Sequence, residues 1–468
     1  LSGAPAAPQD VAALAAELVE RRDEADAALV AALAEAHTRE AAEALVAAYD
    51  VMSSLLMRRE IVLALPAFDD VPGGAQPALQ RLSDVATLEP APELYEEAVD
   101  ALARCPLNGA DFLKRIVDSS AQDPVRLRAM GHLVELLGEG EVDWFREQFE
   151  RTPQADDKEV KRAVQRGEQV ERVTTLVDLR EMAFGRLAPT LKASELRELA
   201  RAKERDAFDL RKDGIRRMAL LELERRDDKR LGRLAEQVFE DRTEKSANRA
   251  LAARLLAEAQ GAKVVGDLCD QGLADPSVTS PQLADALADL VAGLRASRDE
   301  RKLVKLLEGG RPHEQAFALR ALRGLSDADV VALVDELLAG EASPRVAREA
   351  IAFLGACGLA DARAVLEREL DEARDETVAA AALQALSELR GDDPDWIGEL
   401  ERLARDERYR LRNAALAELA RRDARGHQEL LVEALSHPDW STRKVALEGL
   451  EAARTREAVA AIVARMPE

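Results

Sequence analysis

The chain has 468 residues, of which 89 are acidic and 66 basic, so its formal net charge is −23. Hydrophobic residues make up 47 %, which excludes a disordered polyanion, and aromatic residues only 3 %, which disfavours a cofactor cavity lined by Phe or Trp. No stretch reaches the roughly 18 uninterrupted apolar residues of a membrane-spanning helix, so no membrane span is expected.

The amino-terminal start, Leu1 to Pro8, is rich in Ala and Pro. Such a start is typical of the flexible lead of an exported protein whose signal peptide has been removed. It fits a simple boundary of the sequence equally well. The location therefore stays open between an exported, periplasmic protein, which we slightly favour, and a cytoplasmic one.

Residues 1–87 are predicted to form a helical cap followed by irregular repeats, because 9–36 reads as an Ala-rich helix or helix pair. Residues 88–150 are more regular. Within them the motif Ala98-Val99-x-x-Leu102 precedes a similar one at Ala129, and each marks the buried stripe of a helix.

Residues 151–205 interrupt this pattern. The segment 156–186 is highly charged and carries spaced apolar residues such as Val160, Val164 and Val173. We expect one long helix or helical excursion here, an insertion that divides the array into two arms. Because it departs from the repeat, we also expect it to act as a docking element.

Residues 206–468 contain eight regular repeats. Each has the motif Ala-Leu-x-x-Leu or a close variant, and a second amphipathic run follows it. Pro, Ser and Asp at the joints are typical helix starts, and Gly at the ends is a typical helix stop. The motif begins at Ala219, Ala252, Ala286, Ala318, Ala350, Ala382, Ala415 and Ala446.

This periodicity predicts an all-α fold, an α-solenoid in which antiparallel helix pairs stack into a superhelix with a period of about 32 residues. A small Ala lets two helix axes approach closely, while the flanking Leu fills the groove between them. One pair cannot bury its apolar face alone, but stacked pairs form a continuous core. No segment alternates with the period of a β-strand.

Residues 123–133, Asp-Pro-Val-Arg-Leu-Arg-Ala-Met-x-x-Leu, and residues 437–450, which begin His-Pro-Asp-Trp-Ser-Thr-Arg, carry a familiar pattern. It resembles the HEAT repeat family, in particular the short bacterial type similar to the HEAT-like repeats of phycobilisome lyases. The resemblance is strong over 206–468 and fair over 88–150. It implies the solenoid fold and says little about function.

The charge is unevenly distributed. Residues 1–120 carry a net charge of −12, residues 121–230 of zero, and residues 231–468 of −11. The densest basic cluster, at 201–217, is interpreted as a solvated, salt-bridged helix face. Because neutralisation of phosphates dominates nucleic-acid affinity, a chain this acidic is not expected to bind nucleic acid.

An arginine stands three residues before the motif alanine, one helical turn away, in five repeats. It could stack along one face and bond to carboxylates or carbonyls of adjacent repeats, or it could form an anion-binding stripe, since guanidinium suits bidentate carboxylate recognition. These repeat-stacking or anion-binding candidates are Arg126, Arg216, Arg249, Arg412 and Arg443.

No motif indicates catalysis, a cofactor or a metal. Cys105, Cys269 and Cys357 are too far apart for a CxxC site and are predicted to be small buried hydrophobes. The five histidines form no zinc pattern. The HEAT-like iron hydroxylases repeat paired His-Glu steps, whereas this chain has one such step, His313-Glu314.

The sequence therefore favours a non-catalytic scaffold or adaptor, acidic and bacterial in type, that binds other proteins along an extended curved surface. The identity of those proteins stays open. Two alternatives are an accessory or chaperone subunit of a modifying enzyme and a structural subunit of a larger assembly. The apolar run Val459 to Val463 is a candidate contact for such an oligomer.

Overall fold

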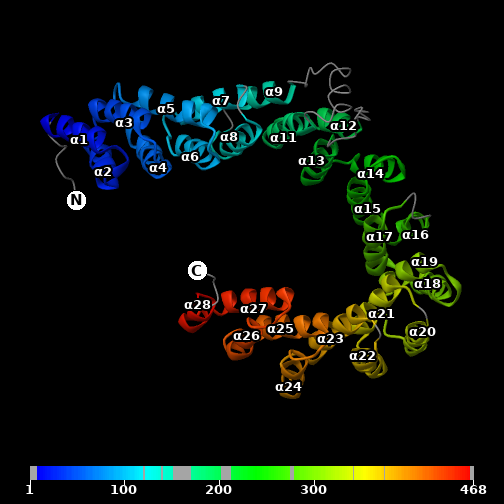
Figure 1. Cartoon of the computed structure of the whole chain (residues 1–468). Helices are drawn as coiled ribbons and strands as arrows, with labels where there is room; N and C mark the ends of the chain where they lie inside the picture. Colours follow the sequence, from blue (N-terminus) through cyan, green and yellow to red (C-terminus); the bar gives the residue numbers. More distant parts are fainter. Residues whose placement is uncertain are drawn as a thin grey trace. The chain divides into compact units, whose positions relative to one another are not determined.

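The computed structural model describes residues 8–119, 122–138, 141–150, 170–201, 212–274, 279–340, 342–373 and 375–463. Within these ranges the secondary structure is helical and includes no strand, so the predicted all-α solenoid is confirmed (Figure 1). The described helices include none that is long and apolar enough to cross a membrane. The chain forms two compact units, Leu1–Leu231 and Gly232–Glu468.

In the first unit the helices form two rows, and short 3₁₀ turns stand at some of the joints. They are α1 (Pro8–Arg21), η1 (Arg22–Glu24), α2 (Ala27–Ala36), α3 (Arg39–Val51), α4 (Leu55–Ala64), η2 (Leu65–Phe68), α5 (Ala75–Leu88), α6 (Pro92–Ala103), α7 (Gly109–Asp118), α8 (Asp123–Leu136), α9 (Val142–Glu150), α11 (Val170–Leu187), η4 (Ala188–Thr190), α12 (Ala193–Arg201) and α13 (Lys212–Arg225).

The second unit continues with the same alternation after α14 (Leu231–Glu240). The first-helix row is α15 (Ser246–Gln260), α17 (Pro281–Leu294), α19 (Pro312–Ala321), α21 (Pro344–Cys357), α23 (Glu376–Arg390), α25 (Tyr409–Asp423) and α27 (Trp440–Ala453). The second-helix row is η5 (Gly261–Val264) with α16 (Val265–Gly272), then α18 (Ser297–Gly309), α20 (Ala328–Ala339), α22 (Ala360–Glu372), α24 (Pro394–Leu403), α26 (Gln428–Ala434) and α28 (Arg456–Val463).

Local chemistry sets where these helices begin and end. The hydroxyl of Ser343 accepts from the backbone N–H of Val346, and Pro344 occupies the first turn of α21, where its missing N–H is not needed. That helix ends at Gly358, whose φ of +70° is readily adopted only without a Cβ. The Pro and Gly signals at the joints therefore act as the sequence analysis expects.

The repeat motif forms the core of the second unit and the end of the first. In six of the eight copies all three apolar positions are at most 2 % exposed. Neighbouring helices of the first-helix row pack directly against one another, as Figure 1 shows for α21, α23 and α25. Ala350, Ile351 and Leu354 on α21 are typical, with at most 1 % of each exposed.

Two copies differ from the predicted pattern. On α17 the buried residues are Leu287, Ala288 and Val291, so the predicted start at Ala286 is displaced by one residue. On α27 Ala446 is buried but Leu447 is 42 % exposed. A sequence motif identifies which residues are apolar, but neighbouring helices decide which of these become buried.

The structure describes part of the predicted insertion. Residues 151–169 lie outside the described residues, but α11 packs against α8 and α9, and α12 packs against α13. On α11 Ala183, Phe184 and Leu187 are buried in the positions that Ala-Leu-x-x-Leu occupies elsewhere. This helix is thus part of the stacked array. The division of the chain at 87, 150 and 205 stays a prediction.

Candidate binding surfaces

Four of the five predicted arginines contact the end of the preceding helix or the loop that follows it. Arg126 donates through Nε to the carbonyl of Val117 at 3.0 Å, and Arg249 through Nε to that of Phe239 at 3.2 Å. Arg443 donates to the carbonyls of His437 and Pro438 at 2.8 and 2.7 Å. Arg216 lies half-buried on α13 and also has an interaction partner.

Arg412 shows the arrangement most fully. Its guanidinium is buried and donates to the carbonyl of Asp406 at 2.8 Å and to the hydroxyl of Thr442 at 3.1 Å. Thr442 in turn donates to the side-chain oxygen of Asn413 at 2.7 Å. These bonds connect the loop after α24 with α25 and α27, which binds one repeat to the next. An anion-binding role for the five arginines stays a prediction.

A second arginine contact was missed by the sequence analysis. The step Glu-x-x-Arg-Arg occurs twice at the same place in the repeat, as Glu222 with Arg226 and as Glu418 with Arg422. Arg226 pairs with Glu222 at 2.6 Å and donates to the carbonyl of Leu191 at 2.6 Å. Arg422 pairs with Glu418 at 2.7 Å and donates to the carbonyl of Ser387. The sequence signal for this contact is that Glu-x-x-Arg-Arg recurs at the same position of two repeats.

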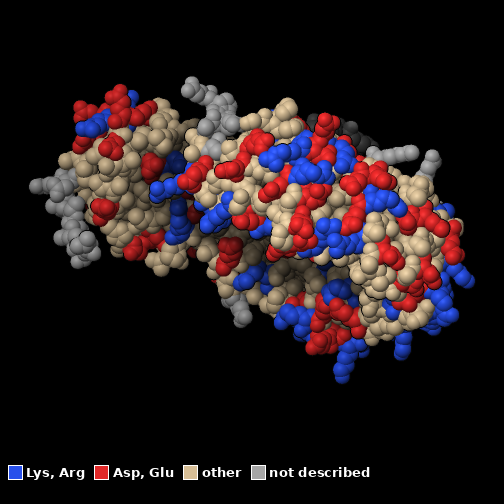
Figure 2. All heavy atoms as spheres, turned by 90° about the horizontal axis from the view of Figure 1, so that it is seen from below, with Lys and Arg blue, Asp and Glu red and all other residues tan. Residues whose placement is uncertain are grey.

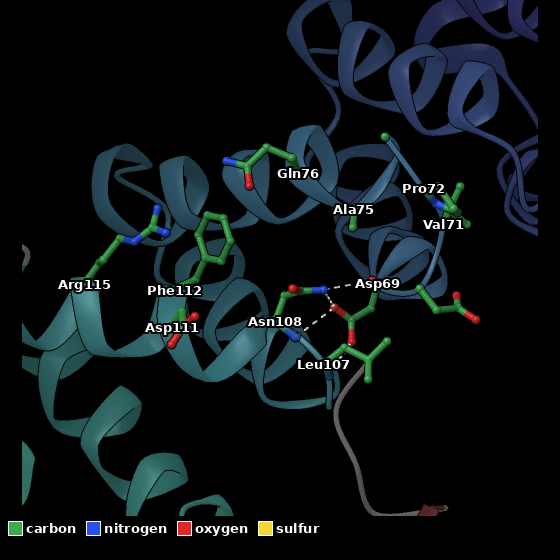
Figure 3. A pocket seen from close by; sticks show the side chains of 12 residues that line it. Asp69, Val71, Pro72, Ala75, Gln76, Leu107, Asn108, Asp111, Phe112 and Arg115 are labelled. Carbon is green, nitrogen blue, oxygen red and sulfur yellow. Dashed lines mark hydrogen bonds between the residues drawn. The ribbon is translucent and has the colours of Figure 1, made fainter. Parts of the chain in front are cut away.

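A cavity of about 530 Å³ lies between the loop after η2 and the start of α7 (Figure 3). At its base the buried carboxylate of Asp69 accepts the backbone N–H groups of Leu107 and Asn108 at 2.8 and 3.2 Å. Asn108 adds a side-chain bond to the same carboxylate at 2.9 Å. Asp69 therefore joins the loops of two successive repeats, and its lone pairs are engaged within the fold.

The mouth of this cavity combines apolar and charged groups. The guanidinium of Arg115 lies over the ring of Phe112, 4.5 Å from its centroid, and Leu107 is 67 % exposed. Asp111 lines the wall, and Asp70 pairs with His37 at 3.0 Å. These groups can contact a polypeptide chain through stacking, apolar burial and hydrogen bonds.

Two of the three cysteines, Cys105 and Cys269, lie in surroundings that disfavour the thiolate form. Burial raises the pKa of the Cys105 thiol to about 12 and that of Cys269 to about 11. At neutral pH both stay protonated, and the thiolate is the reactive species. Cys105 and Cys357 are buried and Cys269 is half-buried. Within the described part of the chain no group of three or more His, Cys, Asp or Glu is placed to hold a metal ion.

A further hollow lies on the second-helix row of the second unit. A space of about 670 Å³ lies between the ends of α20 and α22 and the starts of α21 and α23, and a second space of about 370 Å³ lies between α20 and α22. Arg368 lines both. We call the two spaces together the α20–α22 trough. Among its wall residues are Val331, Ala332, Ala364 and Val365.

The trough was also missed by the sequence analysis. Its signal is a pair of exposed alanines, Ala332 on α20 and Ala364 on α22, at helix positions where a longer side chain would fill the space. The repeat pattern shows only that such positions lie outside the buried core. That they face one another across a hollow follows from helix stacking, which the sequence does not show.

The geometry defines the class of protein first: stacked antiparallel helix pairs with a continuous core are an α-solenoid. Residues 300–387 match the family model described as HEAT repeats, and this stretch includes both α20 and α22. The chain therefore contains HEAT repeats, and the predicted resemblance is confirmed. The narrower likeness to bacterial phycobilisome-lyase repeats stays a prediction. No curated protein matches this sequence.

Several solved structures are similar to the chain. Kap121p bound to Nup53p is 12 % identical with a TM-score of 0.35, covering 98 % of this chain and 52 % of that one. Kap121p bound to Ste12p is 12 % identical with a TM-score of 0.44, covering 96 % and 56 %. A chain from a structure of the cadherin–β-catenin interaction is 16 % identical with a TM-score of 0.27, covering 94 % and 98 %. The present chain thus spans about half the length of the Kap121p chains.

Proposed function

We propose that this protein is a non-catalytic HEAT-repeat scaffold or adaptor that binds other proteins along its extended surface. The observation that carries the proposal is the α20–α22 trough. It is a hollow with small apolar side chains on its walls and charged groups around them, within the matched repeats. Such a groove accepts the side chains of a polypeptide segment laid along it.

Exposed apolar side chains on several repeats support the same function. Leu56, Leu88 and Leu107 in the first unit are 65, 78 and 67 % exposed, and Trp440 in the second is 67 % exposed. Aromatic residues are enriched where proteins meet, because their large surfaces bury well on contact. Contacts spread over many repeats are the usual way in which a solenoid binds its partner.

The test uses the full chain as bait in a native extract, with a bait of equal charge and unrelated fold as the control. Each retained protein is purified and mixed with the full chain, and amide hydrogen exchange is measured. We expect a protein retained in near-stoichiometric amount that protects two or more successive helix pairs. Retention of no protein beyond the control, or protection of a single loop, would contradict the proposal.

A structural subunit of a larger assembly is the second candidate. Leu447 on α27 and Val459 and Val463 on α28 are 42, 57 and 60 % exposed, and a further helix pair or a second copy could cover them. If this candidate is right, the mass measured by light scattering rises with protein concentration, and the double variant Val459→Lys/Val463→Lys stays monomeric. A constant monomeric mass for the unaltered chain would exclude self-assembly.

A further inference from the structure

We propose that the α20–α22 trough docks a basic, amphipathic segment of a partner protein, with apolar side chains in the hollow and Lys or Arg side chains against the surrounding carboxylates. This inference rests on the proposed scaffold function and adds the chemistry of the partner. It follows from three observations: a difference in charge between the two helix rows, unpaired carboxylates beside the trough, and an apolar space left by small side chains.

The charge difference is large. The four helices α20, α22, α24 and α26 of the second-helix row carry thirteen acidic and three basic residues, a net charge of −10. The four helices α21, α23, α25 and α27 of the first-helix row carry seven acidic and nine basic residues, a net charge of +2. The two helices of this row that line the trough, α20 and α22, carry eight acidic and two basic residues, a net charge of −6.

Ion pairs neutralise carboxylates on both rows, for example Glu367 of α22, which pairs with Arg363 at 3.0 Å, so the charge left for a partner depends on which carboxylates stay unpaired. On the first-helix row Arg320 pairs with Asp289 at 2.6 Å and with Glu349 at 3.4 Å, and so connects α17, α19 and α21. Arg345 pairs with Asp285 at 2.6 Å in the same network. Carboxylates held this way already have their counter-charge within the solenoid. Figure 2 shows acidic and basic side chains interspersed on the face that it presents.

In the trough the one arginine among its described wall residues is already neutralised. Arg368 pairs with Asp335 at 2.6 Å and with Glu369 at 2.8 Å. Asp361 and Glu372 also line the trough, are exposed, and take part in no ion pair with any described residue. A partner therefore meets negative charge here, which attracts Lys and Arg and repels phosphate and carboxylate groups.

The apolar space between α20 and α22 is where an apolar side chain of the partner would be buried. Val331 and Val365 are buried at its floor, while the exposed Ala332 and Ala364 are too short to close it. An apolar side chain that enters this space is removed from water on several sides, and about 25 cal/mol is gained per Å² of apolar surface buried. A basic chain without apolar residues would use only the carboxylates.

The experiment measures fluorescence anisotropy of a labelled synthetic helix of about 16 residues, with Leu at every third or fourth position and Lys between. A second peptide has Glu in place of each Lys. Both are titrated with the full chain at low salt and at about 0.3 M NaCl, where exposed charges are strongly screened. We expect the Lys peptide to bind, with affinity falling as salt rises, and the Glu peptide not to bind.

Two variants locate the site. Asp361→Lys/Glu372→Lys should weaken binding of the Lys peptide about tenfold or more, as repulsion replaces attraction. The matched control Glu448→Lys/Glu451→Lys on α27 changes the net charge equally and should weaken it less than about twofold. Ala364→Leu fills the hollow without changing charge and should weaken binding about fivefold with the same salt dependence. Circular dichroism verifies that each variant is folded.

The inference is overturned if the unaltered chain does not bind the Lys peptide, if the two double variants lose affinity equally, or if Ala364→Leu binds as well as the unaltered chain. A captured protein that protects successive helix pairs elsewhere would then leave the scaffold function standing. If the bait retains no protein at all, the scaffold function itself fails.

Discussion

Buried arginines in this solenoid connect its helices and the loops between them. Arg412 has almost no exposed surface, yet its charge is spread over the backbone carbonyls of Asp406 and Glu407 and over the hydroxyl of Thr442. A guanidinium suits this position because it offers five donors in a fixed plane and stays charged when buried. The residue is therefore held by geometry that a lysine cannot reproduce.

We predict that Arg412→Ala lowers the free energy of unfolding by about 2–3 kcal/mol, because it leaves Thr442 and the carbonyl of Asp406 without their charged donor. Arg412→Lys should restore only part of this loss. The exposed neighbour Arg410 provides the control, since Arg410→Ala should change stability little. Thermal unfolding followed by circular dichroism measures all three. Loss of partner binding at unchanged stability would instead assign Arg412 to a ligand.

The buried carboxylate Glu222 makes stability depend on pH. Hydrogen bonds from Arg225, opposed by burial and supported by Arg226, hold its pKa below the ordinary value for glutamate. Its contribution is complete above the unfolded pKa of about 4.3 and disappears as pH falls through the lower folded pKa. We therefore expect Glu222→Gln to be less stable than the unaltered chain at neutral pH.

That difference should shrink as pH is lowered from about 6 to about 3, because the unaltered chain then loses what the variant already lacks. Denaturant titrations at a series of pH values measure it. Glu236→Gln, on the exposed side of α14, is the matched control and should follow the unaltered chain throughout. A gap that stays constant with pH would show that Glu222 stabilises through packing rather than through its charge.

At the scale of the helix, closeness of packing decides which residues are tolerated. A Cβ at Gly272, the last residue of α16, would lie 2.1 Å from the ring of Phe317 on α19, and one at Gly355 on α21 would lie 2.9 Å from the Cβ of Ala385 on α23. Both approaches are shorter than real side chains allow. Gly272 and Gly355 are therefore places of contact between helices.

Gly272→Ala should lower the free energy of unfolding by about 1–3 kcal/mol, since Phe317 is buried and has little room to move. Gly266→Ala lies on the same helix and meets nothing within 4 Å, so it should be neutral or stabilise by up to about 1 kcal/mol through helix propensity. Thermal unfolding compares the pair. If both variants shift the midpoint equally, contact with Phe317 is not the cause.

The repeat could be predicted from the sequence because its pattern is local. Ala415, Leu416 and Leu419 fall on one helix face whatever surrounds them. The same motif in α11 could not be recognised from the sequence, because Phe184 takes the place of Leu and a charged stretch precedes it. The α20–α22 trough could not be predicted from the sequence either, because a hollow depends on which helices become neighbours. Contacts between repeats are the part that local patterns do not contain.

At the scale of the molecule, the chain forms two compact units, and we expect them to unfold separately. Solenoid stability is approximately a sum over repeats and their interfaces, so the chain need not unfold in one step. The three tryptophans report on different units: Trp144 on the first, and the buried Trp396 and exposed Trp440 on the second.

We predict that fluorescence gives two different midpoints in urea. Trp396→Phe/Trp440→Phe leaves Trp144 as reporter of the first unit, and Trp144→Phe/Trp440→Phe leaves Trp396 as reporter of the second. Adding Gly272→Ala should move the Trp396 midpoint and leave the Trp144 midpoint in place, because the substitution lies in the second unit. Coincident midpoints that move together would show one cooperative unit.

The arginine contacts have a direction with consequences during synthesis on the ribosome. Arg126, Arg249, Arg412 and Arg443 each donate to carbonyls that precede them in the chain, and Arg226 and Arg422 reach back 35 residues to Leu191 and Ser387. The donor that completes a repeat is therefore translated after that repeat. A nascent solenoid gains its final contacts one repeat behind the growing end, and its newest repeat is always the one most open to chaperones and proteases.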